Sequence, residues 1–283
     1  MISICIKTCI AVVIFILILS FLGFCMAIYP LHKVRSKVTP DYYSLAFEDV
    51  ILSTHDNVNI SGWFIKSKQP TKKTILILHG YPADKGDLLP GLMFLSENFN
   101  LLFIDFRSFG RSGGNYTTLG AKEKYDVAAA ITYLEDKGFT PVGIYGFSFG
   151  GSVALLSAAN HPEVKAVISD SSFAKLEMML DNYYNIPLLK YPLMELTRLW
   201  GLMFLNEDVK NISPVDSAYE LSIPILIIHS KSDLVIPFKH AKAYQDKLKD
   251  NANVEFVFTK GKKHGEFSND YKDRIKGFFD KHL

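Results

Sequence analysis

Short runs of apolar residues recur along the chain between polar or glycine-containing stretches, and most of them are rich in valine, isoleucine and leucine. Continuous apolar runs of this length are typical of strands that are buried on both faces of a sheet. The pattern predicts strands at residues 74–78, 101–105, 142–145, 167–169, 225–228 and 254–258. Two further strands are expected at 46–52 and 59–65, joined by the turn-prone run 54–57.

Segments with the periodicity of amphipathic helices separate these strands. We expect helices at residues 87–99, 121–137, 151–159, 239–249 and 266–281, and Gly138 ends the second of them. Strands that alternate with helices form a mostly parallel sheet covered by helices on both faces. The sequence therefore predicts an α/β fold, in which a ligand binds at the carboxyl ends of the strands.

Residues 173–219 interrupt the alternation. This stretch has no strand-like run but many large apolar residues, among them Tyr184, Trp200 and Phe204. It is either a pair of helices that packs on the main core, or a helical cap that offers an apolar wall to an acyl chain. We favour the cap because the stretch follows directly after the strand at 167–169.

Residues 8–29 form a single apolar run without one charged residue. About 20 such residues span the core of a bilayer, whereas the apolar core of a signal peptide needs only about 7–15. No small-residue cleavage site closes the run convincingly, so we predict an uncleaved single transmembrane anchor, with a cleaved signal peptide as the alternative. Residues 30–41 are expected to be a basic linker, and residues 42–283 the globular domain.

Positive charge is greater after the apolar run than before it. Lys33, Arg35 and Lys37 follow the run, and only Lys7 precedes it. Basic residues accumulate on the cytoplasmic side of membrane spans. The sequence thus favours a single-pass membrane protein whose globular domain is cytoplasmic.

The remaining composition excludes several classes of function. The chain has 31 basic and 29 acidic residues, and no block of basic residues that would attract nucleic acid. The cysteines Cys5, Cys9 and Cys25 all lie in the first 25 residues. The rest of the chain can therefore hold neither a disulfide framework nor a cysteine-based metal site.

The run GFSFG at 146–150 lies where a predicted strand meets a predicted helix. A chain that turns from strand to helix at a serine must bend sharply, and the flanking Gly146 and Gly150 allow the strand and helix backbones to approach each other. The serine then takes strained dihedral angles and exposes its hydroxyl at the sheet edge. Ser148 is the candidate nucleophile.

A serine hydroxyl needs a general base, and the base needs a carboxylate that orients it. His264 and Asp233 each follow a predicted strand, and their order after Ser148 is the one expected for this kind of turn. Asp170, which also follows a strand, is the alternative acid.

The other histidines are weaker candidates for the base. His55, His161 and His240 have polar surroundings typical of the surface, and His229 is expected to be a structural residue near Asp233. His79 belongs to a separate feature, the run His-Gly-Tyr-Pro at 79–82.

This run follows the strand at 74–78, and its glycine permits a tight turn. A tetrahedral oxyanion needs about two backbone N–H donors. We expect the N–H groups of Tyr81 and Phe149 to supply them, the alternative being that 79–82 is a plain turn from strand to helix. The glycine-rich run 105–114 is expected to be a rigid loop that Asp105 and Arg107 brace, with direct contact to substrate as the alternative.

Taken together, these motifs resemble the α/β-hydrolase superfamily, and more narrowly its single-span, membrane-anchored abhydrolase-domain branch. The resemblance rests on HGYP at 79–82, DFRSFGRSGG at 105–114, GFSFGG at 146–151 and the loops that carry Asp233 and His264. It covers residues 42–283 and implies an eight-stranded sheet, a Ser-His-Asp triad and an acyl-enzyme intermediate. In one departure, Ser108 occupies a position where many relatives carry glycine.

The expected function is that of a serine hydrolase that cleaves an ester or a thioester, with Ser148, His264 and Asp233 as catalytic residues and no metal or organic cofactor. The membrane-adjacent location favours a small lipid-like or acyl substrate. A serine peptidase of prolyl-oligopeptidase type is one alternative, although such enzymes usually carry a propeller domain that this sequence does not encode. A non-catalytic membrane scaffold is the other.

Overall fold

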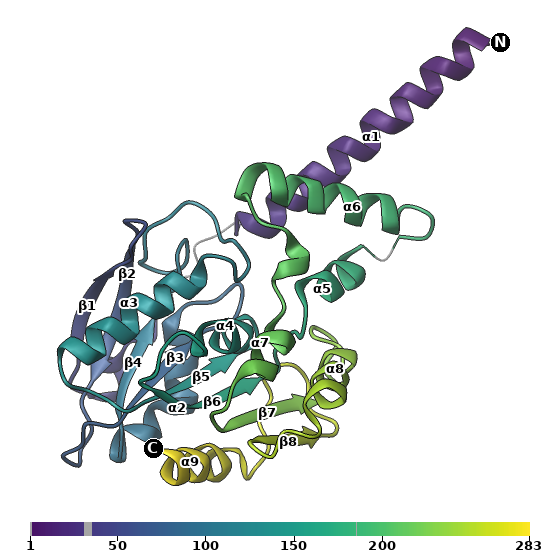
Figure 1. The fold of residues 1–283 in the computed structure, drawn as a ribbon. Helices are drawn as coiled ribbons and strands as arrows, with labels where there is room; N and C mark the ends of the chain where they lie inside the picture. Colours follow the sequence, from purple (N-terminus) through teal and green to yellow (C-terminus); the bar gives the residue numbers. More distant parts are fainter. Residues whose placement is uncertain (1, 31–35, 185) are drawn as a thin grey trace.

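The computed structural model describes residues 2–30, 36–184 and 186–283. An eight-stranded sheet forms its centre, with the strand order β1-β2-β4-β3-β5-β6-β7-β8. β2 pairs antiparallel with β1 and β4, and the remaining neighbours are parallel. The predicted α/β-hydrolase fold, with its mostly parallel eight-stranded sheet, is confirmed (Figure 1).

The strands coincide closely with the apolar runs of the sequence. Their bounds are β1 Glu48–Ser53, β2 Asn59–Ile65, β3 Thr74–Leu78, β4 Asn100–Ile104, β5 Val142–Phe147, β6 Val164–Asp170, β7 Ile225–Ser230 and β8 Val254–Thr259. Every residue of β3, β4 and β7 is buried. These mainly apolar segments are buried along their whole length because helices cover both faces of the sheet.

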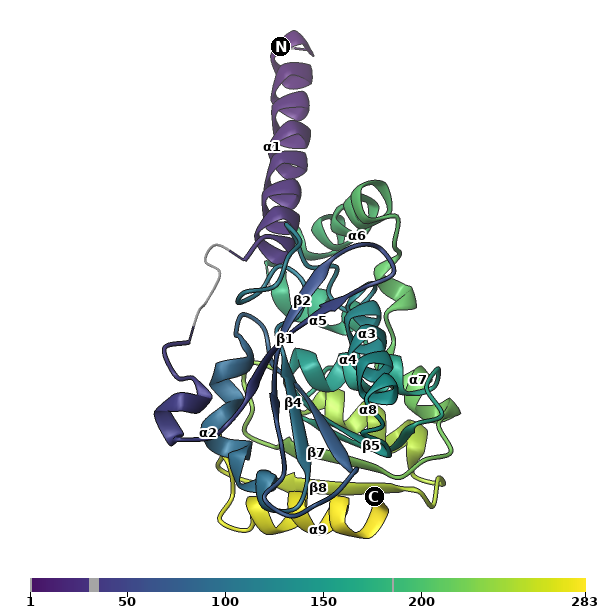
Figure 2. The same ribbon diagram turned by 90° about the vertical axis from the view of Figure 1, so that its left-hand side faces the viewer.

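Helices cover both faces of the sheet. On one face lie α3 (Glu123–Asp136), α4 (Phe149–Ala158), α7 (Pro214–Glu220) and α8 (Lys239–Leu248), and on the other α2 (Leu89–Leu92) and α9 (Tyr271–His282). Figure 2 shows the sheet between these layers, with α9 at the end of the molecule farthest from α1. The carboxyl ends of the parallel strands share one edge, and the candidate residues lie there.

Two predicted helices differ from the structure. The segment predicted as one helix at 87–99 is a series of short turns, 3-10 at Lys85–Leu88 and at Met93–Glu97 on either side of α2. Pro90 accounts for the interruption, because proline lacks an N–H and is tolerated only in the first turn of a helix. The last helix begins at Tyr271 and not at residue 266, after a turn in which the N–H of Tyr271 bonds to Ser268.

The interrupting stretch 173–219 is helical. It contains α5 (Leu176–Tyr183), α6 (Lys190–Trp200), a π-helical turn at Gly201–Leu205 and a 3-10 turn at Val209–Asn211, followed by α7. Helix α7 and one face of α5, with Leu176, Met178 and Met179, pack on the main core. Leu180 of α5 and helix α6 lie against a long helix, α1 (Ile2–Ile28), that projects from the body (Figure 1). Part of the stretch therefore packs on the main core, as one of the two expected alternatives states, and its role as a cap stays a prediction.

Helix α1 is long and apolar enough to cross a membrane, and its body-proximal half is in contact with α6. Phe21 packs edge-on against Trp200, with 5.4 Å between ring centroids, and Phe24 lies 6.1 Å from Phe204. The indole N–H of Trp200 donates to Ser20 Oγ at 3.1 Å. Of the predicted linker 30–41, residues 31–35 lie outside the described residues.

Candidate active site

The turn at Ser148 joins β5 directly to α4. Ser148 has φ 55° and ψ −118°, a strained conformation for a residue with a side chain, and its N–H donates to Asp170 O at 2.7 Å. Glycine is required on both sides. A Cβ at Gly146 would lie 2.3 Å from Gly150 O, and a Cβ at Gly150 would lie 2.2 Å from Leu78 O. The strained turn thus carries the hydroxyl to the edge of the sheet.

The side chains of Ser148, His264 and Asp233 form one hydrogen-bonded chain. His264 Nε2 lies 3.0 Å from Ser148 Oγ, and His264 Nδ1 lies 2.7 Å from Asp233 Oδ2. Asp233 is fully buried, whereas 16% of the His264 side chain is exposed. Residues separated by 116 and 31 positions along the chain are therefore within hydrogen-bonding distance of one another. This is the geometry in which an imidazole takes a proton from a serine hydroxyl.

The loop after β7 fixes the Asp233 carboxylate. Its Oδ1 accepts the N–H groups of Val235 and Ile236, each at 2.9 Å. Burial alone would raise the pKa of Asp233, but the hydrogen bonds from His264 and from these N–H groups outweigh it and hold the pKa below its ordinary value. The carboxylate is therefore ionised near neutral pH and able to orient the imidazole.

The side chain of His229 also holds the loop that carries Asp233. Its Nε2–H donates to Ile236 O at 2.8 Å, and burial lowers the pKa of the imidazole, so that the ring is neutral. Its Nε2 is 4.0 Å from Asp233, too far for a hydrogen bond. His229 holds the loop in place and does not contact the serine–histidine pair.

The run 79–82 lies directly against the turn at Ser148. A Cβ added to Gly80 would be 3.3 Å from the Cβ of Ser148, so glycine permits this close approach. No described residue accepts a hydrogen bond from the backbone N–H of Tyr81 or of Phe149. The N–H of Phe149 is at the first turn of α4, where the helix dipole favours negative charge. Both groups are available as donors to an anion.

His79 links two of the loops at the sheet edge. Its Nδ1–H donates to Gly80 O at 2.7 Å, and its Nε2 accepts the N–H of Phe106 at 3.0 Å. The ring is buried, and burial lowers its pKa. A neutral imidazole with one donor and one acceptor matches both contacts, so that His79 fixes the run 79–82 relative to the loop 105–114.

Sequence reasoning missed a buried ion pair beside these loops. Lys85 Nζ lies 2.5 Å from Asp105 Oδ2, and neither side chain is more than 2% exposed. Asp105 also accepts the N–H groups of Lys85 and Arg111, while Lys85 Nζ donates to Ser61 Oγ. Lysine in a short polar loop gives no signal of burial, because lysines of this kind are mostly solvent-exposed.

The expected bracing roles of Asp105 and Arg107 agree with these contacts. Arg107 donates to Asp126 on α3 through Nε at 2.9 Å and Nη2 at 2.7 Å, and to Asp56 through Nη1 at 2.7 Å. Ser108 adopts φ 65°, a left-handed conformation that glycine adopts more readily than serine. Charged side chains near the start of the loop thus hold it against α3 and against the turn that carries Asp56.

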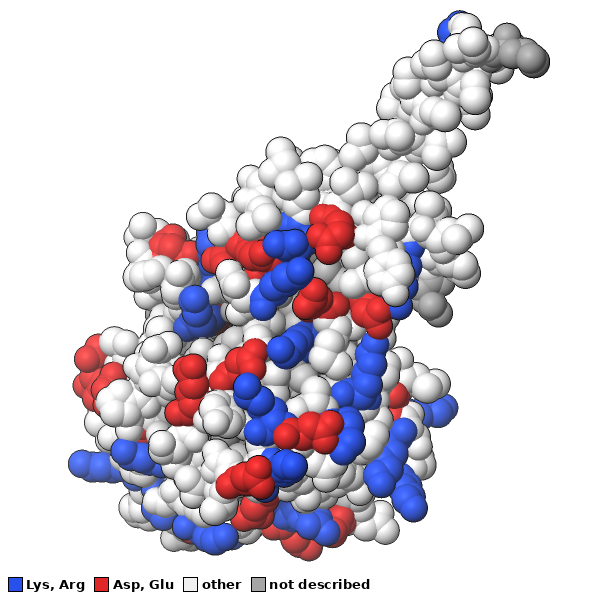
Figure 3. Space-filling view, turned by 45° about the vertical axis from the view of Figure 1, so that its right-hand side comes forward, with Lys and Arg blue, Asp and Glu red and all other residues white. Residues whose placement is uncertain are grey.

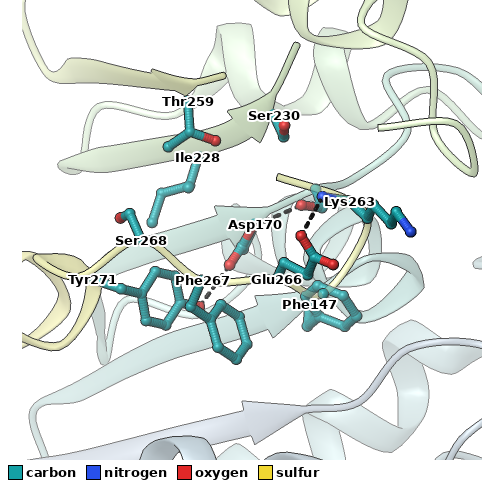
Figure 4. A pocket seen from close by; sticks show the side chains of 12 residues that line it. Phe147, Asp170, Ile228, Ser230, Thr259, Lys263, Glu266, Phe267, Ser268 and Tyr271 are labelled. Atoms are coloured by element: carbon teal, nitrogen blue, oxygen red, sulfur yellow. Dashed lines mark hydrogen bonds between the residues drawn. The ribbon is translucent and has the colours of Figure 1, made fainter. Parts of the chain in front are cut away.

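Asp170 lies nearby but does not contact His264. Its Oδ2 accepts hydrogen bonds from the hydroxyls of Tyr271 at 2.6 Å and Tyr145 at 3.2 Å, and its Oδ1 accepts one from Ser171 at 2.9 Å. Figure 4 shows Asp170 and Tyr271 together in the pocket beneath the loop that carries Lys263. Burial raises the pKa of Asp170. The carboxylate within hydrogen-bonding distance of His264 is therefore that of Asp233 and not that of Asp170.

An open pocket of about 220 Å³ surrounds Ser148 and His264. Its lining is mainly apolar and comprises Gly80, Tyr81, Ala83, Asp87, Leu88, Phe147, Ser148, His264, Gly265 and Phe267. The Phe147 ring packs 4.9 Å from the imidazole of His264. The site therefore has room for a substrate beside the serine.

The pocket is close to the base of α1. The hydroxyl of Tyr81 donates to Met26 O at 3.4 Å, and that of Tyr183 on α5 donates to Gly23 O at 3.3 Å. The side chain of Tyr81 thus contacts α1, while its backbone faces the sheet edge. Helix α5 and the end of α1 lie beside the pocket and contribute to its surroundings.

The expectation of a surface-like environment for His240 is wrong. His240 on α8 is completely buried, and its Nδ1 accepts the N–H of Ala174 at 3.1 Å. Burial, reinforced by the charge of Lys239, lowers its pKa to about 4. The polar neighbours in the sequence face solvent from other sides of the helix, so the sequence pattern concealed this residue.

Comparison with known proteins places this arrangement in a family. The model of the prolyl oligopeptidase family matches residues 92–283, a region that includes Ser148, Asp233 and His264. The chain belongs to this family. It is an α/β hydrolase, and the predicted recognition of that superfamily is confirmed.

Three related proteins illustrate the similarity. The protein YqkD of Bacillus subtilis is 30% identical over 200 residues, which is 67% of this chain and 64% of the relative. The membrane protein YNL320W of Saccharomyces cerevisiae is 25% identical over 85% of this chain and 82% of its own length. The structure of the Pyrococcus furiosus esterase Pf2001 superposes with a TM-score of 0.74 and 26% identity, covering 90% of this chain and 98% of the esterase.

Proposed function

We propose that this protein is a serine hydrolase that cleaves carboxylic esters or thioesters through an acyl-enzyme intermediate. The observation that carries the proposal is the hydrogen-bonded chain from Ser148 through His264 to Asp233 at an open pocket. The similarity to a P. furiosus esterase supports the ester substrate class. No group of three or more His, Cys, Asp or Glu residues in the described parts of the chain is arranged to hold a metal ion.

In the first step, Ser148 Oγ attacks the carbonyl carbon of the substrate while His264 Nε2 takes the hydroxyl proton. Asp233 accepts the Nδ1–H of His264, which keeps the ring in the required tautomer and stabilises the imidazolium that forms. The imidazolium then returns the proton to the alcohol or thiol that leaves. A water molecule, activated by the same imidazole, hydrolyses the acyl-serine and regenerates the enzyme.

The negative charge on the tetrahedral oxygen needs donors that are aimed before the reaction begins. The N–H groups of Tyr81 and Phe149 are the proposed donors, supported by the absence of any acceptor for them among the described residues. The contacts of His79 and of the Lys85–Asp105 pair hold one of these loops in place. Each donor of this kind contributes about 10²–10³ in rate.

The surroundings favour an acyl or lipid-like substrate. We propose that residues 8–29 anchor the protein in a membrane, that residues 42–283 form a hydrolase domain on the cytoplasmic side, and that residues 173–219 act as its cap. The contacts of Tyr81 and Tyr183 with the end of α1 support this arrangement, because they bring the proposed anchor next to the pocket.

Labelling with an active-site fluorophosphonate tests the proposal, because this probe reacts covalently with activated serines. We expect the purified full-length protein to be labelled, and the Ser148→Ala variant to be unlabelled. Ser152→Ala, which removes a buried serine hydroxyl of the same helix that bonds Phe173 O, is the matched control and should retain labelling. A folded wild-type protein that remains unlabelled would contradict the proposal and favour a scaffold.

The family match makes a peptidase the second candidate. A panel of p-nitrophenyl esters of increasing chain length, compared with aminoacyl amides, separates the two. We expect ester hydrolysis that rises with chain length and far slower amide hydrolysis. Cleavage of the amides alone would overturn the choice of esterase and establish a peptidase.

A further inference from the structure

The helical insertion presents large apolar side chains to the outside on both sides of α1. Leu188 in the corner between α5 and α6 is 95% exposed, and Tyr191, in the first turn of α6, is 73% exposed. Met203 and Phe204 in the π-helical turn are 63% and 55% exposed. Contiguous apolar groups of this size are uncommon on a surface that faces only water. We call Ile186, Leu188, Tyr191, Leu202, Met203 and Phe204 the flanking surface.

The flanking surface is continuous with α1. Leu189, next to Leu188, packs in one cluster with Ile16 and Leu19 of α1. At the other end of α6, the ring of Phe204 lies 5.6 Å from that of Phe21. Figure 3 shows α1 leaving the body as an almost uncharged rod beside an uncharged region of the body at its base. The apolar surface of the helix thus extends onto the insertion without an intervening ring of charge.

The length of α1 determines how deep the contacts between α1 and the insertion lie in a bilayer. The uncharged run 8–29 rises about 33 Å at 1.5 Å per residue, which matches the roughly 30 Å hydrocarbon core. Lys7 ends this run at its far side. If the insertion stayed in water, the uncovered part between Lys7 and Ile16 would cover only about 12 Å, far too little to cross. The contacts at Ile16, Leu19 and Phe21 must therefore lie at membrane depth.

Most charged side chains of the insertion form ion pairs, which is compatible with this placement. Arg198 on α6 binds Asp208 through Nη2 at 2.9 Å and Glu195 through Nη1 at 3.2 Å. Lys190 forms an ion pair with Asp181, which also binds Lys239 of α8 at 2.6 Å. The last contact directs Asp181 toward the hydrolase body and away from the flanking surface.

We propose that the flanking surface is a second membrane-contacting element. It inserts into the leaflet nearest the globular domain and holds the hydrolase domain against the lipid. Amphipathic helices at interfaces bury their apolar faces by about 5–10 Å. Phe21, which touches Phe204, lies about 12 Å along the helix from the end of the apolar run at Tyr29, a similar depth. The inference rests on the proposed membrane anchoring by α1.

Depth-dependent fluorescence quenching tests this inference on the full-length protein. Single cysteines are introduced at Leu188 and, separately, at Met203, in a background with Cys5, Cys9 and Cys25 replaced by alanine, and are labelled with bimane. The labelled proteins are placed in phosphatidylcholine nanodiscs with or without bromine atoms at the middle of the acyl chains. Val13→Cys on α1 reports the anchor itself. Asp280→Cys on α9, at the opposite end of the molecule, is the aqueous control (Figure 2).

We expect brominated lipid to quench the labels at residues 188 and 203 to an extent close to that at residue 13, and to leave residue 280 unchanged. Quenching at residue 13 alone would contradict lipid contact by the flanking surface, while still supporting the anchor. That outcome would indicate that a protein partner or a second copy of the chain covers the apolar side chains. Absence of quenching at residue 13 would overturn the anchor, and with it this inference.

Discussion

The sheet edge around Ser148 and the insertion beside it are built from different interactions. At the sheet edge, buried polar groups hold the loops, among them His79, the Lys85–Asp105 pair and the Asp233 carboxylate, each with defined hydrogen-bond partners. In the insertion, α5 and α6 pack on α1 through aromatic and aliphatic contacts, with several apolar side chains left exposed.

The contrast between polar and apolar contacts indicates which region of this fold depends on a fixed geometry. Hydrogen bonds are directional, and a buried polar group without its partner costs about 1–3 kcal/mol, so the loops at the sheet edge have one favoured arrangement. Apolar contacts are not directional and tolerate substitution of similar volume. In the proposed function, the chemistry therefore relies on the first region, and contact with lipid or acyl chains on the second.

The largest effect on activity is expected at His264. His264→Ala removes the proposed general base of Ser148, and should lower kcat by on the order of 10⁴–10⁶ without loss of stability. Steady-state hydrolysis of a p-nitrophenyl ester measures this. His55→Ala, which removes a largely exposed imidazole, is the control and should retain wild-type activity. A loss of less than tenfold at His264 would show that another group acts as the base.

A smaller loss is expected when the orienting carboxylate is replaced. Asp233→Asn keeps the shape of the side chain but favours the wrong tautomer of His264, and should lower kcat by about 10⁴. Asp170→Asn is the matched control, because the same change falls on a carboxylate bonded to Tyr145 and Tyr271. Its kcat should fall far less. The reverse order of the two variants would assign the orienting role to Asp170.

The buried ion pair tests how strongly the sheet edge depends on polar contacts. Lys85→Met leaves the carboxylate of Asp105 buried without its charge partner, which should lower the free energy of unfolding by about 3–5 kcal/mol. Lys242→Met breaks an exposed pair with Asp246, and should change it by less than about 0.5 kcal/mol. Urea unfolding in detergent micelles compares the two variants. Equal small losses would mean that the buried pair contributes nothing specific.

The protonation of His240, which lies at the junction of the two regions, is expected to make the free energy of unfolding depend on pH. Burial lowers the pKa of His240 to about 4, below its unfolded value of 6.5, so the unfolded state binds more protons between these values. Its contribution to stability is complete above pH 6.5 and decreases as the pH falls toward 4. Linkage gives a loss of roughly 2 kcal/mol between pH 7 and pH 5.

His240→Asn provides the comparison, because its amide oxygen can still accept the N–H of Ala174 but cannot titrate. The variant should show a flatter dependence of unfolding free energy on pH over this range. Unfolding curves at pH 5, 6 and 7 measure the slope. If both proteins have the same slope, His240 does not titrate in this range.

The sequence predicted most of the sheet and the order of the candidate residues. β2 and β3 have the predicted bounds. A short apolar run rich in β-branched residues is typical of a strand buried on both faces, so its ends mark the ends of the strand. The residues at 87–99 were predicted less well. Pro90 is tolerated only in the first turn of a helix, so the chain forms several short turns around α2 instead of one long helix. Ser148, Asp233 and His264 could be found since each lies in the turn or loop that follows a strand.

The supporting contacts could not be predicted in the same way. The Tyr145–Tyr271 hydrogen bond joins residues 126 positions apart, and the Lys85–Asp105 pair joins two loops with ordinary polar composition. Such pairs depend on how the strands are ordered in space, which no local pattern records. The burial of His240 has the same origin, because it results from contact with Ala174 in another segment.

Trapping the acyl-enzyme tests most directly whether Ser148 is the nucleophile. The full-length protein is mixed with p-nitrophenyl butyrate, quenched with acid during turnover and digested for peptide mass mapping. We predict one butyryl group on the peptide that contains Ser148, and neither this adduct nor turnover in Ser148→Ala. Ester turnover that persists in Ser148→Ala, with the acyl group on another residue or on none, would contradict the mechanism.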